Sequence, residues 1–321
     1  MPGVDVHQHL WPEAVLHALE RRSSAPCATW TAESWRLELA GEPAFLVDPA
    51  DHDITERVAA VQAASLDRAL VALSSPVGIE ALDADEAAPV LAAWQHAASA
   101  LPAALGWWGA VPLAAPTDEV VAAAEAALDS GAAGVVVGAG ALATPAGLER
   151  LGELLDHLED RLAPLFVHPG PAPWTPATAA VDAAWWAPAT RYVAELHAAW
   201  HAWSAWGRAA HPGLRVVWAA LAGLAPLHAE RTALRGGPSS PGPDPLEFYD
   251  TSGYGPRALR WMACAVGTSQ LVHGTDAPVV TGPIHEPEPG SSRTGCLDAD
   301  AHRAFRTDNV ARLLGTAWVA T

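Results

Sequence analysis

The sequence contains no lysine, and all 18 of its basic residues are arginine. This absence excludes a phosphate-binding loop built around a lysine, a Schiff-base enzyme and a metal pair bridged by a carboxylated lysine. Against 18 arginines stand 36 acidic residues, which gives a formal net charge of -18. Because so acidic a chain is repelled by nucleic acid and by anionic membranes, we expect neither as a partner.

Cysteine and long apolar runs are also scarce. Cys27, Cys264 and Cys296 are far apart and form no CxxC pair, which argues against a disulfide framework and a structural zinc–thiolate site. No uncharged apolar run reaches the ~18 residues that span a bilayer. The N-terminus, MPGVDVHQH, has neither the basic region nor the apolar core of a signal peptide. We therefore expect a soluble, cytoplasmic protein.

The composition is that of a folded domain with a large core, with 50% hydrophobic and 17% charged residues. At roughly 150 residues per domain the chain could form two domains, but α/β barrels run longer as one. Since neither an internal repeat nor a low-complexity linker divides the sequence, we predict a single domain over residues 1–321.

Short apolar runs alternate with alanine-rich amphipathic segments along the whole chain. The runs are flanked by Gly, Pro, Ser or Asp, which is typical of strands buried on both faces. Eight such runs with helices between them predict an α/β fold, a (β/α)8 barrel. A doubly wound sheet is the alternative, but no glycine-rich phosphate loop follows the first run. The runs are 3–7, 69–73, 105–111, 134–137, 165–167, 214–218, 247–251 and 270–275.

Two segments interrupt this alternation. Within about 25–50, residues 35–39 alternate apolar and polar, a turn follows at AGEP, and residues 44–47 complete a small hairpin that could form part of a lid. Within 174–210 tryptophans recur at helical spacing, which favours a role in the core or an interface over contact with substrate. Because tryptophan-rich helices can pack against a second copy of the chain, a homodimer is a possible assembly.

Polar side chains that can bind a metal stand where three of the runs end. His7 and His9 end the first run and, two apart on a strand, face the same side. His168 ends the fifth run and Asp276 follows the eighth. Because barrel active sites lie at the carboxyl ends of the strands, we expect a divalent metal site here. Zn²⁺ suits these ligands best, with Mn²⁺, Fe²⁺ and Co²⁺ as alternatives, and Asp5 is expected behind the metal.

The stretches VDVHQHLWP, FVHPGP, HGTDAP and DNVARLLG resemble the amidohydrolase superfamily. Within it they are similar to the amidohydrolase-related group that includes aminocarboxymuconate-semialdehyde decarboxylase, in the expected order and over essentially the whole chain. The resemblance implies that His7, His9, His168 and Asp276 hold one divalent metal. The absence of lysine agrees with the mononuclear site of that group.

One position departs from the group, whose sixth strand commonly ends in a histidine within a His-Gly-Gly-Gly-like stretch. Here residues 219–226 read AALAGLAP, and alignment on the proline puts Ala220 at that histidine. In the family the histidine positions or deprotonates the metal-bound water. His228 and His273 are the candidates to replace it, although surface exposure or packing between barrel and helices would explain both. The odd spacing places His273 on the opposite side of its strand from Asp276.

Other candidates would contact the substrate. Trp11 directly follows the metal-binding pair and would line the pocket wall. Arg21 could clamp a substrate carboxylate, although a solvated helix face explains it as well. Asp250 ends the seventh run and would face the mouth of the barrel or cap a turn. His197 and His201 share a helix face, but the order of residues does not form an HExxH motif.

These residues predict metal-assisted hydrolysis of a small amide, ester or lactone, in which Asp276 both binds the metal and relays a proton. The first alternative is non-oxidative decarboxylation of an unsaturated or aromatic acid, which would release CO₂ instead of an acid or amine. The second is a non-catalytic metal- and ligand-binding barrel, favoured by the alanine-rich stretch where the strand-six histidine is missing.

Overall fold

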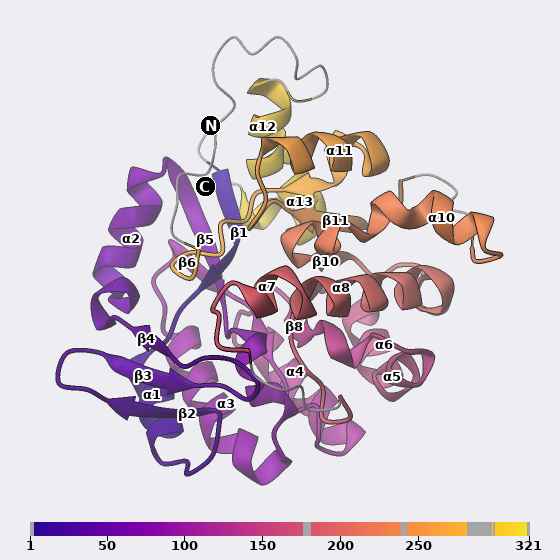
Figure 1. Cartoon of the computed structure of the whole chain (residues 1–321). Coiled ribbons are helices and arrows are strands. Elements are labelled where there is room, and N and C mark those ends of the chain that lie inside the picture. The colour runs from indigo at the N-terminus through magenta and orange to yellow at the C-terminus, as the bar shows by residue number, and fades with distance from the viewer. Residues whose placement is uncertain (1–2, 176–180, 239–242, 281–296, 298, 320–321) are drawn as a thin grey trace.

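The computed structural model describes residues 3–175, 181–238, 243–280, 297 and 299–319, and it forms a barrel of parallel strands (Figure 1). The strands lie in the orders β1-β5-β6 and β12-β11-β10-β9-β8-β7. Their bounds are β1 (Gly3–His9), β5 (Leu66–Ala72), β6 (Leu105–Trp107), β7 (Gly109–Ala110), β8 (Val135–Gly138), β9 (Leu165–His168), β10 (Val216–Trp218), β11 (Glu247–Asp250) and β12 (Leu271–Val272).

The two sheets are joined into one barrel at two places. The β6 and β7 segments belong to one run, interrupted at Trp108. At the other seam, the backbone N–H of Val6 donates to the carbonyl of His273 and that of His9 donates to the carbonyl of Ala277, both at 2.8 Å. Every residue of β8, β9, β10 and β11 is buried, as expected for strands covered on both faces. The predicted (β/α)8 barrel is confirmed.

Helices follow the strands around the outside of the barrel. The helical segment after β8 is divided at Leu151 into α5 and α6. The bounds are α1 (Glu13–Glu20), α2 (Ile54–Ala63), α3 (Ala84–Ser99), α4 (Thr117–Asp129), α5 (Pro145–Arg150), α6 (Gly152–Asp160), α7 (Trp186–Ala189), α8 (Arg191–Ala202), α9 (Arg208–Ala210), α10 (Ala229–Leu234), α11 (Pro256–Val266), α12 (Ala299–Arg306) and α13 (Asp308–Leu314). Within the described ranges, no helix is long and apolar enough to cross a membrane.

The insertion after β1 is a three-stranded antiparallel sheet at one side of the barrel (Figure 1). Its strands are β2 (Cys27–Trp30), β3 (Trp35–Glu38) and β4 (Phe45–Val47). The pairing of β3 with β4 is the hairpin expected from the sequence, and β2 adds a third strand.

The turn between β3 and β4 is held against α8. The hydroxyl of Tyr192 donates to Glu42 at 2.8 Å, and Arg191 forms an ion pair with the same carboxylate. Farther along α8, the Glu195 Oε2 accepts the backbone N–H of Gly170 at 2.9 Å, two residues beyond His168. The insertion is therefore anchored through α8 to the loop after β9, which favours a fixed wall over a mobile lid.

The tryptophan-rich segment divides between core and surface. Trp200 and Trp203 are buried, whereas Trp185, Trp186 and Trp206 are exposed. The buried pair follows the expected preference for packing.

Both the homodimer and the single domain over residues 1–321 stay predictions.

A buried carboxyl group lies in the loop after β5. Glu80 is 2% exposed, its Oε1 accepts the hydroxyl of Ser75 at 2.8 Å, and its Oε2 has no hydrogen-bond partner among the described residues. Burial raises the pKa of Glu80 from its ordinary 4.5 to about 7, because the ionised form is poorly solvated there. Ionisation of Glu80 therefore opposes folding.

We predict that Glu80→Gln stabilises the protein at alkaline pH. Below pH 4.5 Glu80 is protonated in the folded and unfolded states alike, so its ionisation costs nothing. As the pH rises from 4.5 to 7, the free energy of unfolding of the wild type falls by roughly 2 to 3 kcal/mol, whereas that of the variant does not change through this group. Thermal unfolding of both proteins at pH 5 and pH 8 measures this difference. The exposed Glu153→Gln is the control, and an equal effect of Glu80→Gln at both pH values would refute the prediction.

Candidate metal centre

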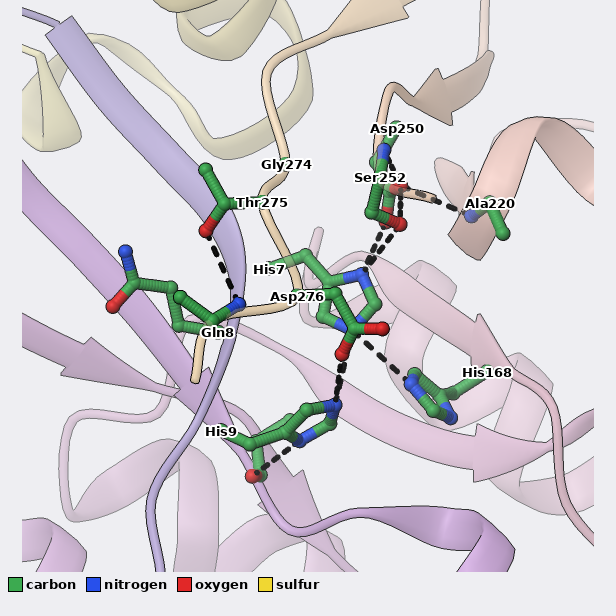
Figure 2. Close-up of polar contacts among 12 residues, drawn as sticks. His7, Gln8, His9, His168, Ala220, Asp250, Ser252, Gly274, Thr275 and Asp276 are labelled. Atoms are coloured by element: carbon green, nitrogen blue, oxygen red, sulfur yellow. Dashed lines mark hydrogen bonds and ion pairs between the residues drawn. The ribbon is translucent and has the colours of Figure 1, made fainter. Parts of the chain in front are cut away.

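The structure brings together the four residues that the sequence predicts as metal ligands (Figure 2). His7 and His9 lie on β1, His168 is the last residue of β9, and Asp276 lies four residues beyond β12. The Nε2 of His7 is 3.2 Å from the Nε2 of His9 and 3.1 Å from that of His168. The Oδ1 of Asp276 is 2.9 Å from the His9 Nε2, and one ligand atom of each residue lies within 4.8 Å of the others.

The Nδ1 atom of each imidazole ring, on the side away from the cluster, also has a polar partner. The Nδ1 of His7 is 2.7 Å from the Oδ2 of Asp250, while the Nδ1 atoms of His9 and His168 face the carbonyls of Ala72 at 3.1 Å and Pro169 at 2.9 Å. Since all three partners are acceptors, each Nδ1 carries the ring proton. The Nε2 lone pairs therefore point at one common position, which is the arrangement that a metal ion requires.

A divalent metal fits this donor set. The His7 Nε2 lies at hydrogen-bond distance from the Nε2 atoms of His9 and His168, and unprotonated nitrogens so close repel unless a cation lies between them. The Asp276 Oδ1 is buried, and none of the described residues offers it an aligned hydrogen bond. A buried polar atom left in this way is costly, and a metal ion would satisfy it. Three imidazole nitrogens and one carboxylate oxygen are ligands of zinc, iron and manganese sites.

Asp250 orients His7 from behind. It is fully buried, and its Oδ1 accepts the backbone N–H groups of Ala220 at 3.0 Å and Ser252 at 2.9 Å, together with the Ser252 hydroxyl at 2.5 Å (Figure 2). The sequence predicts that Asp250 either faces the mouth as a substrate contact or caps a turn. The structure places its carboxylate behind His7, a predicted metal ligand, where it also accepts the N–H of Ser252 two residues on. Ser252, whose hydroxyl contacts Asp250 and the Nδ1 of His7, belongs to the candidate site and was missed by the sequence reasoning.

A second carboxylate joins β1 to the segment that carries Asp276. The Oδ1 of Asp5 accepts the backbone N–H groups of His7 at 3.0 Å and Thr275 at 3.2 Å. Its Oδ2 accepts the Gln8 amide at 2.7 Å and the Thr275 hydroxyl at 2.6 Å. Asp5 therefore lies behind the metal centre, as expected. Asp276 itself has a φ of 62°, a left-handed conformation that aspartate tolerates better than most residues.

The carboxylates make the centre favourable for positive charge. Burial alone would lower the pKa of His7, but the charges of Asp250 and Asp276 outweigh it and raise that pKa to about 9. Burial, reinforced by the charges of His7 and His9, holds the pKa of His168 well below its ordinary value. One site thus attracts a cation and also contains a neutral imidazole, and both properties suit metal binding.

The remaining predicted site residues lie outside the group of four. Trp11 is buried in the loop after β1, and Arg21 is exposed at the end of α1. His228 is exposed, with its ring 5.0 Å from that of His197, and His273 is buried with its backbone carbonyl in the barrel seam. Neither histidine joins the metal cluster. Their catalytic roles, and the substrate contacts of Trp11 and Arg21, stay predictions.

The segment where the family histidine is expected is a left-handed turn. Residues 220–224 have φ values between 47° and 68°, and they lie within a 3₁₀ segment, η6 (Ala219–His228). Left-handed backbone costs roughly 1 to 2 kcal/mol for a residue with a Cβ, and Gly223 alone in this turn lacks one. The turn aims the N–H of Ala220 at Asp250, so the position expected to hold a histidine does lie beside the centre.

No protein-family model matches this chain, and no curated protein matches it in sequence. Solved structures do match, and several of them are named amidohydrolases or decarboxylases. At 20% identity or less these likenesses show the fold, which is the one that the sequence resemblance implies.

Three of these structures cover almost the whole chain. IDCase from Metarhizium anisopliae has a TM-score of 0.77 at 20% identity, over 98% of this chain and 97% of its own. The 5-carboxyvanillate decarboxylase of Sphingomonas paucimobilis has a TM-score of 0.68 at 17% identity, over 98% of both chains. A dihydroxybenzoic acid decarboxylase from Polaromonas, with bound manganese and 2-nitroresorcinol, has a TM-score of 0.64 at 11% identity, over 98% of this chain and 96% of its own.

These likenesses correct the predicted reaction. The similar structures that are named for a defined substrate are decarboxylases, acting on 5-carboxyvanillate, 2,6-dihydroxybenzoate or dihydroxybenzoic acid. The prediction of a hydrolase is therefore wrong, and its decarboxylase alternative is the better interpretation.

We predict that His168→Ala abolishes binding of a divalent metal. The substitution removes one of four ligands from a buried site, and the remaining donors no longer surround the ion. Elemental analysis after reconstitution with Zn²⁺ or Mn²⁺ measures the metal per chain, with His201→Ala as the control histidine variant. Full stoichiometric binding by His168→Ala would contradict the ligand assignment.

A subtler effect is expected for Asp250→Asn. The amide keeps the shape of the side chain but removes the charge that holds the His7 Nδ1 proton. We predict metal affinity weaker by about 10- to 100-fold, with the stoichiometry retained. Competition with a chromogenic chelator gives the dissociation constant, and an affinity equal to that of the wild type would show that Asp250 has no role in positioning His7.

Proposed function

We propose that the protein is a metal-dependent, non-oxidative decarboxylase of an aromatic or unsaturated carboxylic acid. The observation that carries the proposal is the cluster of His7, His9, His168 and Asp276 in a barrel that is similar to several solved decarboxylases. At the position of the expected water-activating histidine stands Ala220, whose backbone N–H donates to Asp250. Hydrolysis needs a base to deprotonate water, and losing one typically costs ~10²–10⁴ in rate. Decarboxylation uses no water as nucleophile, but the group that the sequence resembles includes a decarboxylase and commonly has this histidine, so its absence alone does not decide between the two reactions.

The structural likenesses support the same reaction. Several similar barrels are named as decarboxylases of hydroxylated aromatic acids, and two such structures contain manganese. A small aromatic acid is accordingly the substrate class that we propose. The prediction of an enzyme that is either a hydrolase or a carboxy-lyase is thereby narrowed to a carboxy-lyase.

The identity of the metal follows from the donor set. We propose Zn²⁺ on the basis of three imidazoles and one carboxylate, with Mn²⁺ as the alternative that the similar structures favour. When bound, the metal would supply a Lewis acid that anchors the substrate and withdraws electron density from it.

Each residue of the centre has a defined part in this proposal. His7, His9 and His168 hold the metal at the mouth of the barrel, and Asp250 keeps His7 in its tautomer. In the reaction, the bond between the substrate carbon and its carboxylate breaks, CO₂ leaves with both oxygens, and one proton replaces it on the carbon. Asp276 belongs to the metal cluster, where one of its carboxylate oxygens would bind the metal. We propose that its other carboxylate oxygen carries this proton.

We predict CO₂ release from hydroxybenzoates by the metal-loaded protein. A panel of 2,6-dihydroxybenzoate, 5-carboxyvanillate and related acids is incubated with the holoprotein, and CO₂ and the decarboxylated phenol are measured. His168→Ala is expected to lose activity by at least about 10³-fold, because the Lewis acid is lost. Hydrolysis of control amides and esters without any CO₂ would overturn the proposal. Metal and acid binding without turnover would support the non-catalytic barrel.

A further inference from the structure

A cavity of about 700 Å³ lies on the outer side of α1, between the inserted sheet and the helices. Its walls come from residues 10–12 after β1, from one face of α1, from β2 and β3, from η1 (Pro49–His52) with the start of α2, and from the end of α3. None of the four metal ligands lines it. The cavity therefore has a lining of its own, although it includes Leu10, the residue after His9, and Trp11, a predicted substrate contact.

Aromatic side chains form one wall of this cavity. The rings of Trp30 and Trp35 lie 5.3 Å apart at 64°, and the ring of His17 lies 5.1 Å from that of Trp35. Trp35 is buried, whereas Trp30 is 45% exposed and offers its surface to the cavity. Apolar side chains, including Leu16 and Ile54, complete an environment suited to a flat organic molecule.

The charges that line the cavity have one predominant sign. Glu13, Glu20 and Asp53 carry carboxylates, and no arginine belongs to the described lining. His17 bridges two of these carboxylates, with its Nε2 3.4 Å from Glu13 and its Nδ1 3.0 Å from Glu20. The hydrogen bond to Glu20 raises the pKa of His17 above its ordinary value, so a protonated His17 balances part of this negative charge. Burial, together with the nearby charges of Arg57 and His9, lowers the pKa of His52 to about 4, so this imidazole adds no positive charge at neutral pH.

We propose that this cavity is a binding site for a small aromatic cation, such as a protonated arylalkylamine. The apolar and tryptophan surfaces would pack against the ring, and the ammonium group would lie near the carboxylates and an indole face. The same carboxylates repel the anionic acids that the metal centre would decarboxylate. The ligand that we propose for this cavity thus has the opposite charge from the substrate proposed for the metal centre. The inference does not depend on the proposed function.

The charge preference can be tested with three ligands that share one ring system. Titration calorimetry of the full-length holoprotein compares tryptamine, a cation, with indole, which is neutral, and indole-3-acetate, an anion. Tryptamine is expected to bind at least about 10-fold more tightly than indole, and indole-3-acetate is expected to bind more weakly than indole. Absence of tryptamine binding, or equal binding of all three ligands, would overturn the proposal.

Variants of the lining residues test whether tryptamine binds in this cavity. Trp30→Ala and Glu20→Gln alter exposed positions, and each is expected to weaken tryptamine binding by about 3- to 10-fold. Trp261→Ala removes an exposed tryptophan on α11 and should bind as the wild type does. Unchanged binding by both cavity variants would refute the site.

A metal-centre variant separates this inference from the proposed function. His168→Ala is expected to bind tryptamine with wild-type affinity while it loses decarboxylation. Loss of tryptamine binding in His168→Ala would instead place the ligand at the metal centre, which would overturn the inference and leave the proposed reaction untouched. Circular dichroism of each variant verifies that the fold is intact.

Discussion

The metal centre depends on the closure of the barrel between β1 and the segment after β12. His7 and His9 come from the first strand and Asp276 from the segment that follows the last, so they meet only because this seam is formed. The Asp5 carboxylate holds it by accepting four hydrogen bonds, from His7, Gln8 and Thr275. Gly274 permits the close approach, since a Cβ there would lie 2.9 Å from the Cβ of Asp250. One buried carboxylate thus joins the fold to the site.

A sequence pattern could predict the metal ligands but not the groups behind them. His7 and His9 show the two-residue period of a strand, and His168 and Asp276 stand at run ends, so barrel geometry alone brings them together. Asp250 has the same kind of position, and a pattern cannot tell whether its carboxylate faces the mouth or a neighbouring ring. That depends on the rotamer and on Ser252, which are set by packing.

The fold was predictable for a similar reason. Eight apolar runs with intervening helices define the barrel through local periodicity. The left-handed turn at residues 220–224 lacked any such signal, because glycine, the residue that favours this backbone, occupies one of its five positions. The contact between Glu42 and α8 joins segments about 150 residues apart, and no local pattern specifies it. Sequence periodicity therefore gave the scaffold, while long-range contacts determined how the site is supported.

The strained turn persists because α8 and the core hold it in place. Leu221 is fully buried, and burying a leucine contributes roughly 1.5 to 3 kcal/mol, comparable to the 1 to 2 kcal/mol that its backbone conformation costs. His197 of α8 donates to the carbonyl of Gly223 at 2.7 Å. Two residues earlier, Glu195 accepts the N–H of Gly170 in the loop that follows His168. One helix thus braces the turn that reaches Asp250 and the loop that carries a metal ligand, so both sides of the centre depend on its position.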